Sequence, residues 1–215
     1  MSTLRSRIRG GESATLEYKS KVSDPAKLAR TLAAFANGAG GTVFVGVSDR
    51  GEIVGVEDRE AEVAALEAAL GYLVPQPEHR IEQHVHELKD VLAISVEPIE
   101  FPDFCVHDDF GEETLYFRVQ AATRPVDRET EKAVVRLRKH MRGERRLSET
   151  GQRLLDWLWT NGEAVEGACC RRINYSKTRL RKLMEELIGG GYVVPCNMGQ
   201  GRTYVAIAPG PGAGR

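Results

Sequence analysis

The sequence predicts an α+β fold in two parts, with a mixed sheet and helices over residues 1–142 and a small winged helix-turn-helix domain over residues 147–208. Three observations lead to this prediction. In the first part, short segments with apolar residues at every second position alternate with segments whose apolar residues recur at helical spacing. The second part has the order helix, short helix, helix and two strands. A polar stretch, "HMRGERRLSET", separates them. The last residues, 209–215, are rich in Pro and Gly and are expected to be disordered.

The composition predicts a cytoplasmic protein that makes no contact with a membrane. Of the 215 residues 41% are hydrophobic, which is enough to build a core. No apolar run approaches the roughly 20 residues of a membrane span. The basic start "MSTLRSRIRGGES" lacks the apolar segment of a signal peptide. The cysteines show no CxxC spacing, which argues against a zinc finger or a disulfide framework. They are Cys105, Cys169, Cys170 and Cys196.

The net charge of −1 hides a marked segregation of charge along the chain. Residues 1–48 carry seven Lys/Arg and three Asp/Glu, a net of +4, whereas residues 49–113 carry four and eighteen, a net of −14. Residues 114–215 carry nineteen and ten, a net of +9. Charge separated in this way can steer a polyanion to one face, although any single run can also be plain solvated surface.

An extended segment and a helix open the first domain. Residues 12–21 are expected to be extended, because Leu16, Tyr18 and Ser20 alternate with the charged residues Glu17, Lys19 and Lys21. The helix in "SDPAKLARTLAAFAN" is expected to begin after Ser23 or Asp24 as its N-cap, with Pro25 in the first turn, and to end at Asn37.

A glycine-rich connection, "NGAGGT", joins this helix to a buried strand over residues 42–47. "SDRGE" then predicts a hairpin turn with Gly51 at positive φ and residues 52–56 as the return strand. The glycines do not form a phosphate loop, because Walker A and dinucleotide-binding loops lead from a strand into a helix, and a Walker A loop also needs a Lys. ATP binding is therefore not the function that these glycines favour.

Further elements follow along the chain. A second helix is expected from Asp58, its N-cap, to Gly71. Strands are expected over residues 80–87, 91–97 and 114–120, and a basic amphipathic helix over residues 127–141.

The second domain is expected to begin with the helix in "SETGQRLLDWLWTNG" and a short helix over residues 166–172. A third helix lies in "NYSKTRLRKLMEELIGGGY", with Asn174 as its cap. Two strands around a Gly-rich turn end the domain. The apolar face of the third helix consists of Leu180, Leu183, Met184, Leu187 and Ile188.

Three carboxylates of the first domain are candidate metal ligands. Glu12, Glu17 and Asp49 could hold Mg²⁺ or Mn²⁺ at a strand edge, and Lys19 could neutralise a phosphate, which would suit phosphodiester cleavage. The alternative is an ordinary ion pair between Glu17 and Lys19, with Asp49 a turn residue chosen for local hydrogen bonding.

Three segments carry a family resemblance: "GESATLEYKSK", "LAAFANGAGGTVFVGVSDRGEIVG" and "LYFRVQAATRP". Together they resemble the Schlafen AlbA_2 domain, a family of DNA-binding domains once described as divergent AAA ATPases, over residues 11–123. The resemblance implies an α+β nucleic-acid-binding domain, which in bacterial members is often followed by a helix-turn-helix. In animal Schlafens a Glu/Glu/Asp trio cleaves RNA, and the matching positions are Glu12, Glu17 and Asp49, with Lys19 beside them.

The sequence departs from the family pattern in three places. The usual E-F-K is E-Y-K, the usual Asn-Thr is Asn37-Gly38, and the usual G-V-D-D is G-V-S-D, with Ser48 in place of an acid. The missing acid implies a weaker cation site. Vertebrate Schlafens pair two such lobes into a clamp, so a clamp built from this chain would require a homodimer.

The third helix of the second domain carries the candidate DNA contacts. Helix-turn-helix modules insert their later helix into the major groove, led by its N-terminal residues. Lys and Arg would neutralise phosphates and Asn or Ser could touch base edges. The alternative is a winged helix for protein contacts with solvated charges. The candidate nucleic-acid-binding residues are Arg171, Arg172, Asn174, Ser176, Lys177, Arg181, Lys182 and Arg202.

These patterns predict a cytoplasmic, homodimeric DNA-binding protein that prefers DNA over RNA, acts as a transcriptional regulator, and has neither catalytic activity nor cofactor. The alternative is a Schlafen-like endoribonuclease for structured RNA such as tRNA, which would use Glu12, Glu17 and Asp49 with Mg²⁺ or Mn²⁺. A third hypothesis is an adaptor whose winged helix only mediates dimerisation.

Overall fold

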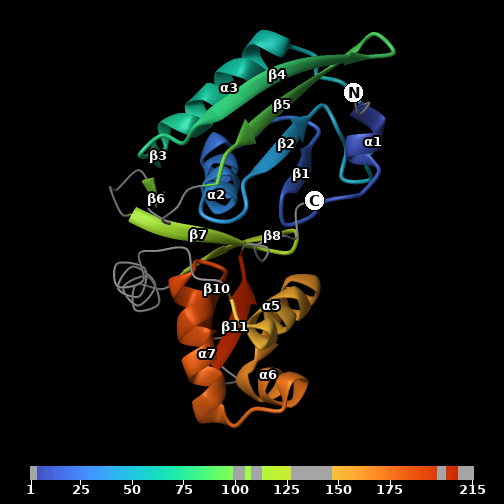
Figure 1. Ribbon diagram of the computed structural model, residues 1–215. Coiled ribbons are helices and arrows are strands. Elements are labelled where there is room, and N and C mark those ends of the chain that lie inside the picture. Colours follow the sequence, from blue (N-terminus) through green and yellow to red (C-terminus); the bar gives the residue numbers. More distant parts are fainter. Residues whose placement is uncertain (1–3, 99–104, 108–112, 127–146, 198–201, 208–215) are drawn as a thin grey trace. The chain divides into compact units, whose positions relative to one another are not determined.

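The structure, a computed structural model, describes residues 4–98, 105–107, 113–126, 147–197 and 202–207 (Figure 1). The chain divides into two compact units. Unit 1 comprises Met1–Ile99 and Asp103–Pro125, and unit 2 comprises Glu100–Pro102 and Val126–Arg215. The predicted α+β class is confirmed. The helix predicted over residues 127–141 and the tail 209–215 lie outside the described residues.

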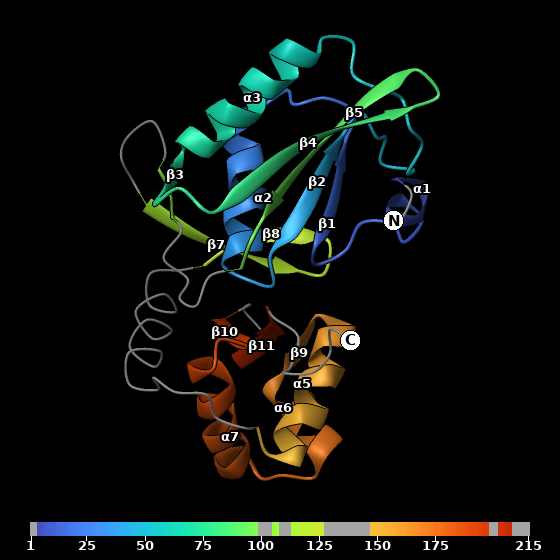
Figure 2. The same cartoon turned by 45° about the horizontal axis from the view of Figure 1, so that its top comes forward.

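A four-stranded mixed sheet lies at the centre of unit 1 (Figure 2). Its order is β1-β2-β5-β4, in which β1 runs parallel to β2 and the other neighbours are antiparallel. A parallel pair requires a crossover connection, and the helix α2 supplies it. The strands are β1 (Leu16–Lys19), β2 (Gly41–Val45), β4 (His79–His86) and β5 (Lys89–Val96).

Helix α2 (Pro25–Ala36) is the central element of unit 1. Asp24 caps it as predicted, its side chain accepting the backbone N–H of Lys27. The helix contacts the main sheet, helix α3 (Arg59–Gly71) and a second sheet. Because other elements cover it on several sides, every residue of its second half is buried. The second sheet contains β3 (Leu73–Val74), β6 (Cys105–His107), β7 (Glu113–Val119) and β8 (Ala122–Pro125).

The other face of the main sheet carries a smaller core. Helix α1 (Leu4–Ile8), which the sequence patterns did not predict, places Ile8 against Tyr18 and Phe44. The Tyr18 hydroxyl donates to the backbone oxygen of Ile8 at 2.6 Å. Successive residues of a strand face opposite sides, so Phe44 packs here while its neighbours Val43 and Val45 pack in the core around α2.

Two details of unit 1 differ from the sequence prediction. The return strand expected over residues 52–56 does not form; the described residues there make only the isolated bridge Val47–Ile53. Gly46 and Gly55 both have positive φ, and the N–H groups of Val54 and Gly55 both donate to the oxygen of Gly46, so the segment closes on itself instead of continuing a ladder. Gly71 does not terminate α3 in a left-handed conformation, because Tyr72 is its C-cap.

The described residues of unit 2 form three helices and a small antiparallel sheet of order β10-β11-β9. The apolar faces of the first and third helices form the core, with Leu154, Leu155 and Leu158 buried together with the predicted set from Leu180 to Ile188. Strand β9 was not predicted. The elements are α5 (Glu149–Asn161), β9 (Glu163–Val165), α6 (Glu166–Ile173), α7 (Lys177–Gly189), β10 (Val193–Asn197) and β11 (Arg202–Ala206).

The predicted cap of α7 is wrong by two residues. Ser176 is the N-cap, and its side chain accepts the backbone N–H of Arg179. Asn174 instead ends α6 in the left-handed conformation, at φ 54, where Asn is one of the few side chains tolerated. The turn between α6 and α7 is therefore made by Asn174, Tyr175 and the capping residue Ser176.

The glycine-rich connection yields a stability prediction. Gly40 has φ +74, and a Cβ there would meet the oxygen of Val96 at 2.9 Å, whereas a Cβ on Gly10 would meet nothing within 4 Å. We expect Gly40→Ala to destabilise the protein by at least about 1–2 kcal/mol, the cost of a left-handed conformation for an L-residue. Gly10→Ala is the control and should leave the urea midpoint, followed by circular dichroism, unchanged. Equal midpoints for both variants would contradict this explanation.

Candidate functional site

A buried ion pair lies where the second sheet meets β1. Nη1 of Arg118 donates to Oε2 of Glu17 at 2.7 Å, and the Arg118 side chain is only 2% exposed. The same guanidinium donates to Thr123 Oγ1 at 3.0 Å and to the Ser13 oxygen at 2.9 Å. Lys19 Nζ donates to the other oxygen of Glu17. Both carboxylate oxygens of Glu17 are therefore engaged by cations.

The glycine run is part of the same arrangement. The guanidinium of Arg118 lies over the ring of Phe35, 4.9 Å from its centroid. A Cβ on Gly41 would come within 2.6 Å of that ring, so only glycine allows Phe35 to lie this close to the start of β2. The "AFAN" helix end, the glycines, the E-x-K strand and Arg118 thus form one packed unit. The sequence patterns did not identify Arg118 as the partner of Glu17.

Glu12 and Asp49 lie in a different environment from Glu17. Oε1 of Glu12 accepts the backbone N–H of Tyr18 at 3.0 Å. Burial raises the pKa of the Tyr18 phenol above its ordinary value, and the charge of Glu12 raises it further. Asp49 is exposed in the turn after β2. Since Glu17 and Tyr18 are consecutive strand residues, Glu17 points away from the face on which Tyr18 and Asp49 lie.

The predicted cation site is not assembled in this arrangement. Among the described residues, no group of three or more His, Cys, Asp or Glu is placed to hold a metal ion. Glu17 is engaged by Arg118 and Lys19, and a carboxylate held by two cations is a poor ligand for a third. The residues present do not fit a Mg²⁺ or Mn²⁺ ion bound by Glu12, Glu17 and Asp49 together.

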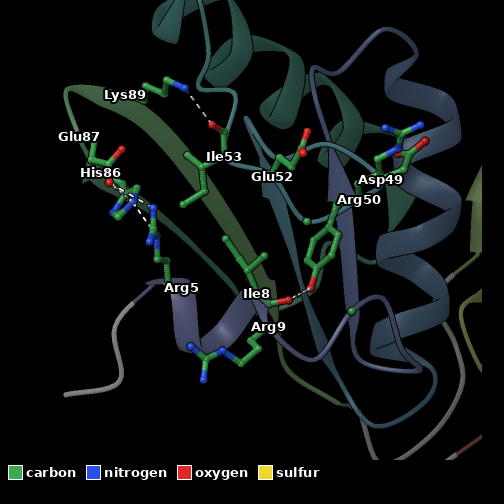
Figure 3. A pocket seen from close by; sticks show the side chains of 13 residues that line it. Arg5, Ile8, Arg9, Asp49, Arg50, Glu52, Ile53, His86, Glu87 and Lys89 are labelled. Atoms are coloured by element: carbon green, nitrogen blue, oxygen red, sulfur yellow. Dashed lines mark hydrogen bonds and ion pairs between the residues drawn. The ribbon is translucent and has the colours of Figure 1, made fainter.

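A pocket of about 460 Å³ lies beside Asp49, between α1, the turn after β2 and the β4–β5 hairpin (Figure 3). Arg5 bridges two of these elements, donating to His86 Nε2 at 3.0 Å and to Glu87 Oε1 at 3.1 Å. Lys89 donates to the oxygen of Ile53 at 3.1 Å. The pocket therefore mixes both signs of charge, and Arg5, His86 and Glu87 in its lining interact with one another.

In unit 2, exposed cations gather around the start of α7. Lys177 and Arg179 lie in its first turn, which contains no acidic residue, and Arg171 and Arg172 lie in the last turn of α6. All four are exposed. The Arg179 guanidinium lies over the Tyr175 ring, 4.3 Å from its centroid. Arg179 was absent from the predicted set; its position three residues after the N-cap was the available signal.

Arg181 has a different environment from the other predicted contacts. Its guanidinium donates to Glu166 Oε1 at 2.7 Å and to Oε2 at 3.3 Å, so its charge is largely compensated within the unit. Hydrogen bonding from Arg181 lowers the pKa of the Glu166 carboxyl below its ordinary value against the effect of burial, and the charges of Lys177 and Arg202 also lower it. Lys177, Arg181 and Arg202 therefore surround one carboxylate.

The remaining predicted residues are placed as follows. Lys182 and Asn174 are exposed, Arg202 is exposed at the first position of β11, and Ser176 uses its hydroxyl to cap α7. Cys169 and Cys170 are free thiols, and burial raises the pKa of Cys169 to about 12, which leaves it protonated. No helix in the described part of the chain is long and apolar enough to cross a membrane.

Unit 1 is thus an α+β domain whose signature segments converge on one buried Glu–Arg pair. The sequence model of the family "Schlafen, AlbA_2" matches residues 12–127, more than half of the chain, and the chain belongs to this family. This membership indicates a function related to nucleic acids. No curated protein matches the chain. Among solved structures, the DIP2311 protein from Corynebacterium diphtheriae is similar, with 19% identity and a TM-score of 0.42, over 67% of this chain and 33% of that one.

The buried pair yields a prediction about stability. Removing one member of a buried ion pair leaves an uncompensated charge, which costs about 3–5 kcal/mol. We expect Arg118→Met to destabilise unit 1 by roughly that amount, whereas Lys19→Met should cost less than about 1 kcal/mol because Lys19 is 29% exposed. Hydrogen exchange of the α2 amides measures both.

The double variant Glu17→Gln with Arg118→Met separates charge from packing. Because it removes both charges, it should be more stable than Arg118→Met alone. A double variant that is less stable by the sum of the two single effects would contradict a direct interaction.

The Glu166–Arg181 pair predicts a pH dependence for unit 2. A carboxyl whose pKa is lowered on folding stabilises the folded state above its unfolded pKa, and this contribution disappears as the pH falls through the lowered folded value. The difference in urea midpoint between the wild type and Glu166→Gln should be largest at neutral pH and shrink below about pH 4. Both tryptophans, Trp157 and Trp159, lie in α5, so tryptophan fluorescence reports on unit 2. A difference that grows on acidification would refute the assigned interaction.

Proposed function

We propose that this protein is a cytoplasmic, non-catalytic DNA-binding protein that acts as a transcriptional regulator, with unit 2 as a winged helix-turn-helix. The observation that carries the proposal is the set of exposed cations at the start of α7. Helices α6 and α7 are joined by a three-residue turn, and the antiparallel strands β10 and β11 follow as in a wing. In such modules the second helix of the pair enters the major groove.

The electrostatics of the α7 start support an anionic partner. The helix N-terminus itself carries a partial positive charge, and Lys177 and Arg179 add full charges to it. The Tyr175 ring holds the guanidinium of Arg179, which reduces the entropy that Arg179 would lose on contacting a phosphate or a base edge. Arg181 is not included among the proposed contacts, because Nε and Nη2 of its guanidinium already donate to Glu166.

Duplex DNA is favoured over RNA for a geometric reason. The major groove of B-DNA is about 12 Å wide and admits an α-helix, whereas the deep and narrow major groove of A-form RNA does not. A helix led by Lys177 and Arg179, with Arg171 and Arg172 at the end of the preceding helix, presents its charges to the groove and its flanking phosphates.

The ribonuclease alternative gains no comparable support. Cleavage by Glu12, Glu17 and Asp49 needs carboxylates free to bind a cation, and Glu17 is held by Arg118 and Lys19. The described residues of unit 1 form no group able to hold a metal ion. Hydrolysis of tRNA with Mn²⁺, abolished by Glu17→Ala but not by Lys177→Glu, would establish this alternative in place of our proposal.

The proposal predicts a position-dependent effect of charge reversal. Arg179→Glu should weaken binding to a duplex at least about tenfold and reduce the slope of log affinity against log salt by about 1, because one phosphate contact is lost. Fluorescence anisotropy of a labelled duplex at several salt concentrations measures both quantities.

Arg153→Glu is the matched control, because Arg153 is exposed on α5 and the charge change is the same. It should have a clearly smaller effect on affinity. Equal losses for the two variants would indicate only a general electrostatic attraction and would overturn the placement of the contact at α7.

A further inference from the structure

Strand β4 is a long, regular edge of the main sheet. In the described part of the chain its one partner is β5, with which it pairs residue by residue from His79 to His86, without a bulge or a proline. In both views of the chain it forms the outer margin of this sheet (Figures 1 and 2). Proteins usually protect such edges with bulges, prolines or very short strands, and β4 has none of these devices.

The hairpin geometry identifies which backbone groups face outward. Glu87 and Leu88 have φ 50 and 63, which is a two-residue hairpin turn of the primed type. The pair closing such a turn, His86 and Lys89, exchanges both hydrogen bonds, and alternate pairs along the ladder repeat this. The N–H of Glu97 donates to the backbone oxygen of Glu78 at 3.1 Å, which continues the same alternation of hydrogen-bonded pairs along the ladder.

The odd-numbered residues of β4 therefore direct their N–H and C=O groups away from β5. No described residue supplies hydrogen-bond partners for these outward groups. The same residues lie on the face of the sheet covered by α3, since Ile81 packs against the core and Gln83 accepts from Arg59. They are His79, Ile81, Gln83 and Val85.

Apolar surface accompanies the free backbone on this face. Val85 is 66% exposed. A groove of about 450 Å³ runs between α3 and β4, with Val63, Ile81 and Leu92 among its lining residues. A strand added beside β4 would thus find both hydrogen-bonding groups and apolar side chains on the same face.

We propose that two copies of this chain pair through β4, antiparallel and centred on Gln83, to form one continuous eight-stranded sheet. This register places Gln83 opposite Gln83 and Ile81 opposite Val85 twice, which gives about six backbone hydrogen bonds. It also places Glu82 opposite His84. The neighbouring register, shifted so that Glu82 opposes Glu82, puts like charges together and is disfavoured.

The other edge of the sheet is not available for such pairing. Strand β1 has four residues, and its own chain occupies its outer groups. The N–H of Tyr18 donates to Glu12, and the oxygen of Leu16 accepts from the N–H of Ser13. Among the described residues, the β4 edge therefore leaves the main sheet open to a second copy, and this interface does not depend on the proposed DNA contacts.

Sedimentation velocity of the full chain over a range of concentrations tests the proposal. We expect a monomer–dimer equilibrium in the wild type. Val85→Lys should weaken association at least about tenfold, because it places a charge opposite Ile81 at both ends of the interface. Leu88→Lys is the matched control: Leu88 is fully exposed at the hairpin tip, outside the paired stretch, and the change should leave association unaltered.

Gln83→Pro provides a second variant, because it removes an outward N–H without breaking the ladder to β5. It should also weaken association, with the far-UV circular dichroism spectrum showing that the fold is retained. A wild type that stays monomeric at all concentrations would overturn the proposal. So would a dimer that persists unchanged in folded Val85→Lys or Gln83→Pro.

Discussion

The buried pair of Glu17 and Arg118 is the interaction on which unit 1 depends. It joins two residues 101 positions apart and ties the first strand of the main sheet to the second sheet. Arg118 lies over Phe35 at the end of the central helix, and Phe35 can lie there only because Gly41 has no side chain. Gly41, in the glycine run that at first suggests a phosphate loop, is therefore a packing requirement of this ion pair. The three separated segments that carry the family resemblance thus meet around one buried charge pair, and most hydrogen-bonding groups of this pair have partners.

The same interaction constrains the chemistry of the domain. A carboxylate held by two cations stabilises the fold but is poorly available to a metal ion or a substrate. Of the other two carboxylates of the expected trio, Glu12 accepts the backbone N–H of Tyr18 and Asp49 is exposed in the turn after β2. Unit 2 has the opposite character in the part that the structure describes, because Arg181 is paired with an acid whereas Lys177 and Arg179 remain exposed at the start of α7. The charges of the two units thus differ in their surroundings: in the first unit those of the ion pair are buried, and in the second the cations at the start of α7 are exposed.

The exposed surfaces of the two units suit different kinds of partner. Exposed guanidinium and ammonium groups at α7 suit a polyanion, whose phosphates they can neutralise. The β4 edge instead offers alternating backbone donors and acceptors beside apolar side chains, which suits another strand. A protein with both surfaces can combine self-association with nucleic-acid contact, as palindromic DNA sites require of dimeric regulators.

Local signals in the sequence were sufficient for much of the secondary structure. Asp24 and Asp58 as N-caps, together with the helical spacing of Leu180 to Ile188, located three helices because capping and amphipathic periodicity depend on residues within a few positions. Only the tertiary structure decided the partner of Glu17, the absence of the return strand after β2, and the pairing of Arg181 with Glu166. The two ion pairs join groups that only folding brings together, and the missing strand depends on backbone conformations that several glycines allow. The spacing of neighbouring side chains in the sequence encodes neither of these causes. The family could therefore be recognised from sequence, whereas the role of each charge became clear only when its partner was located in space.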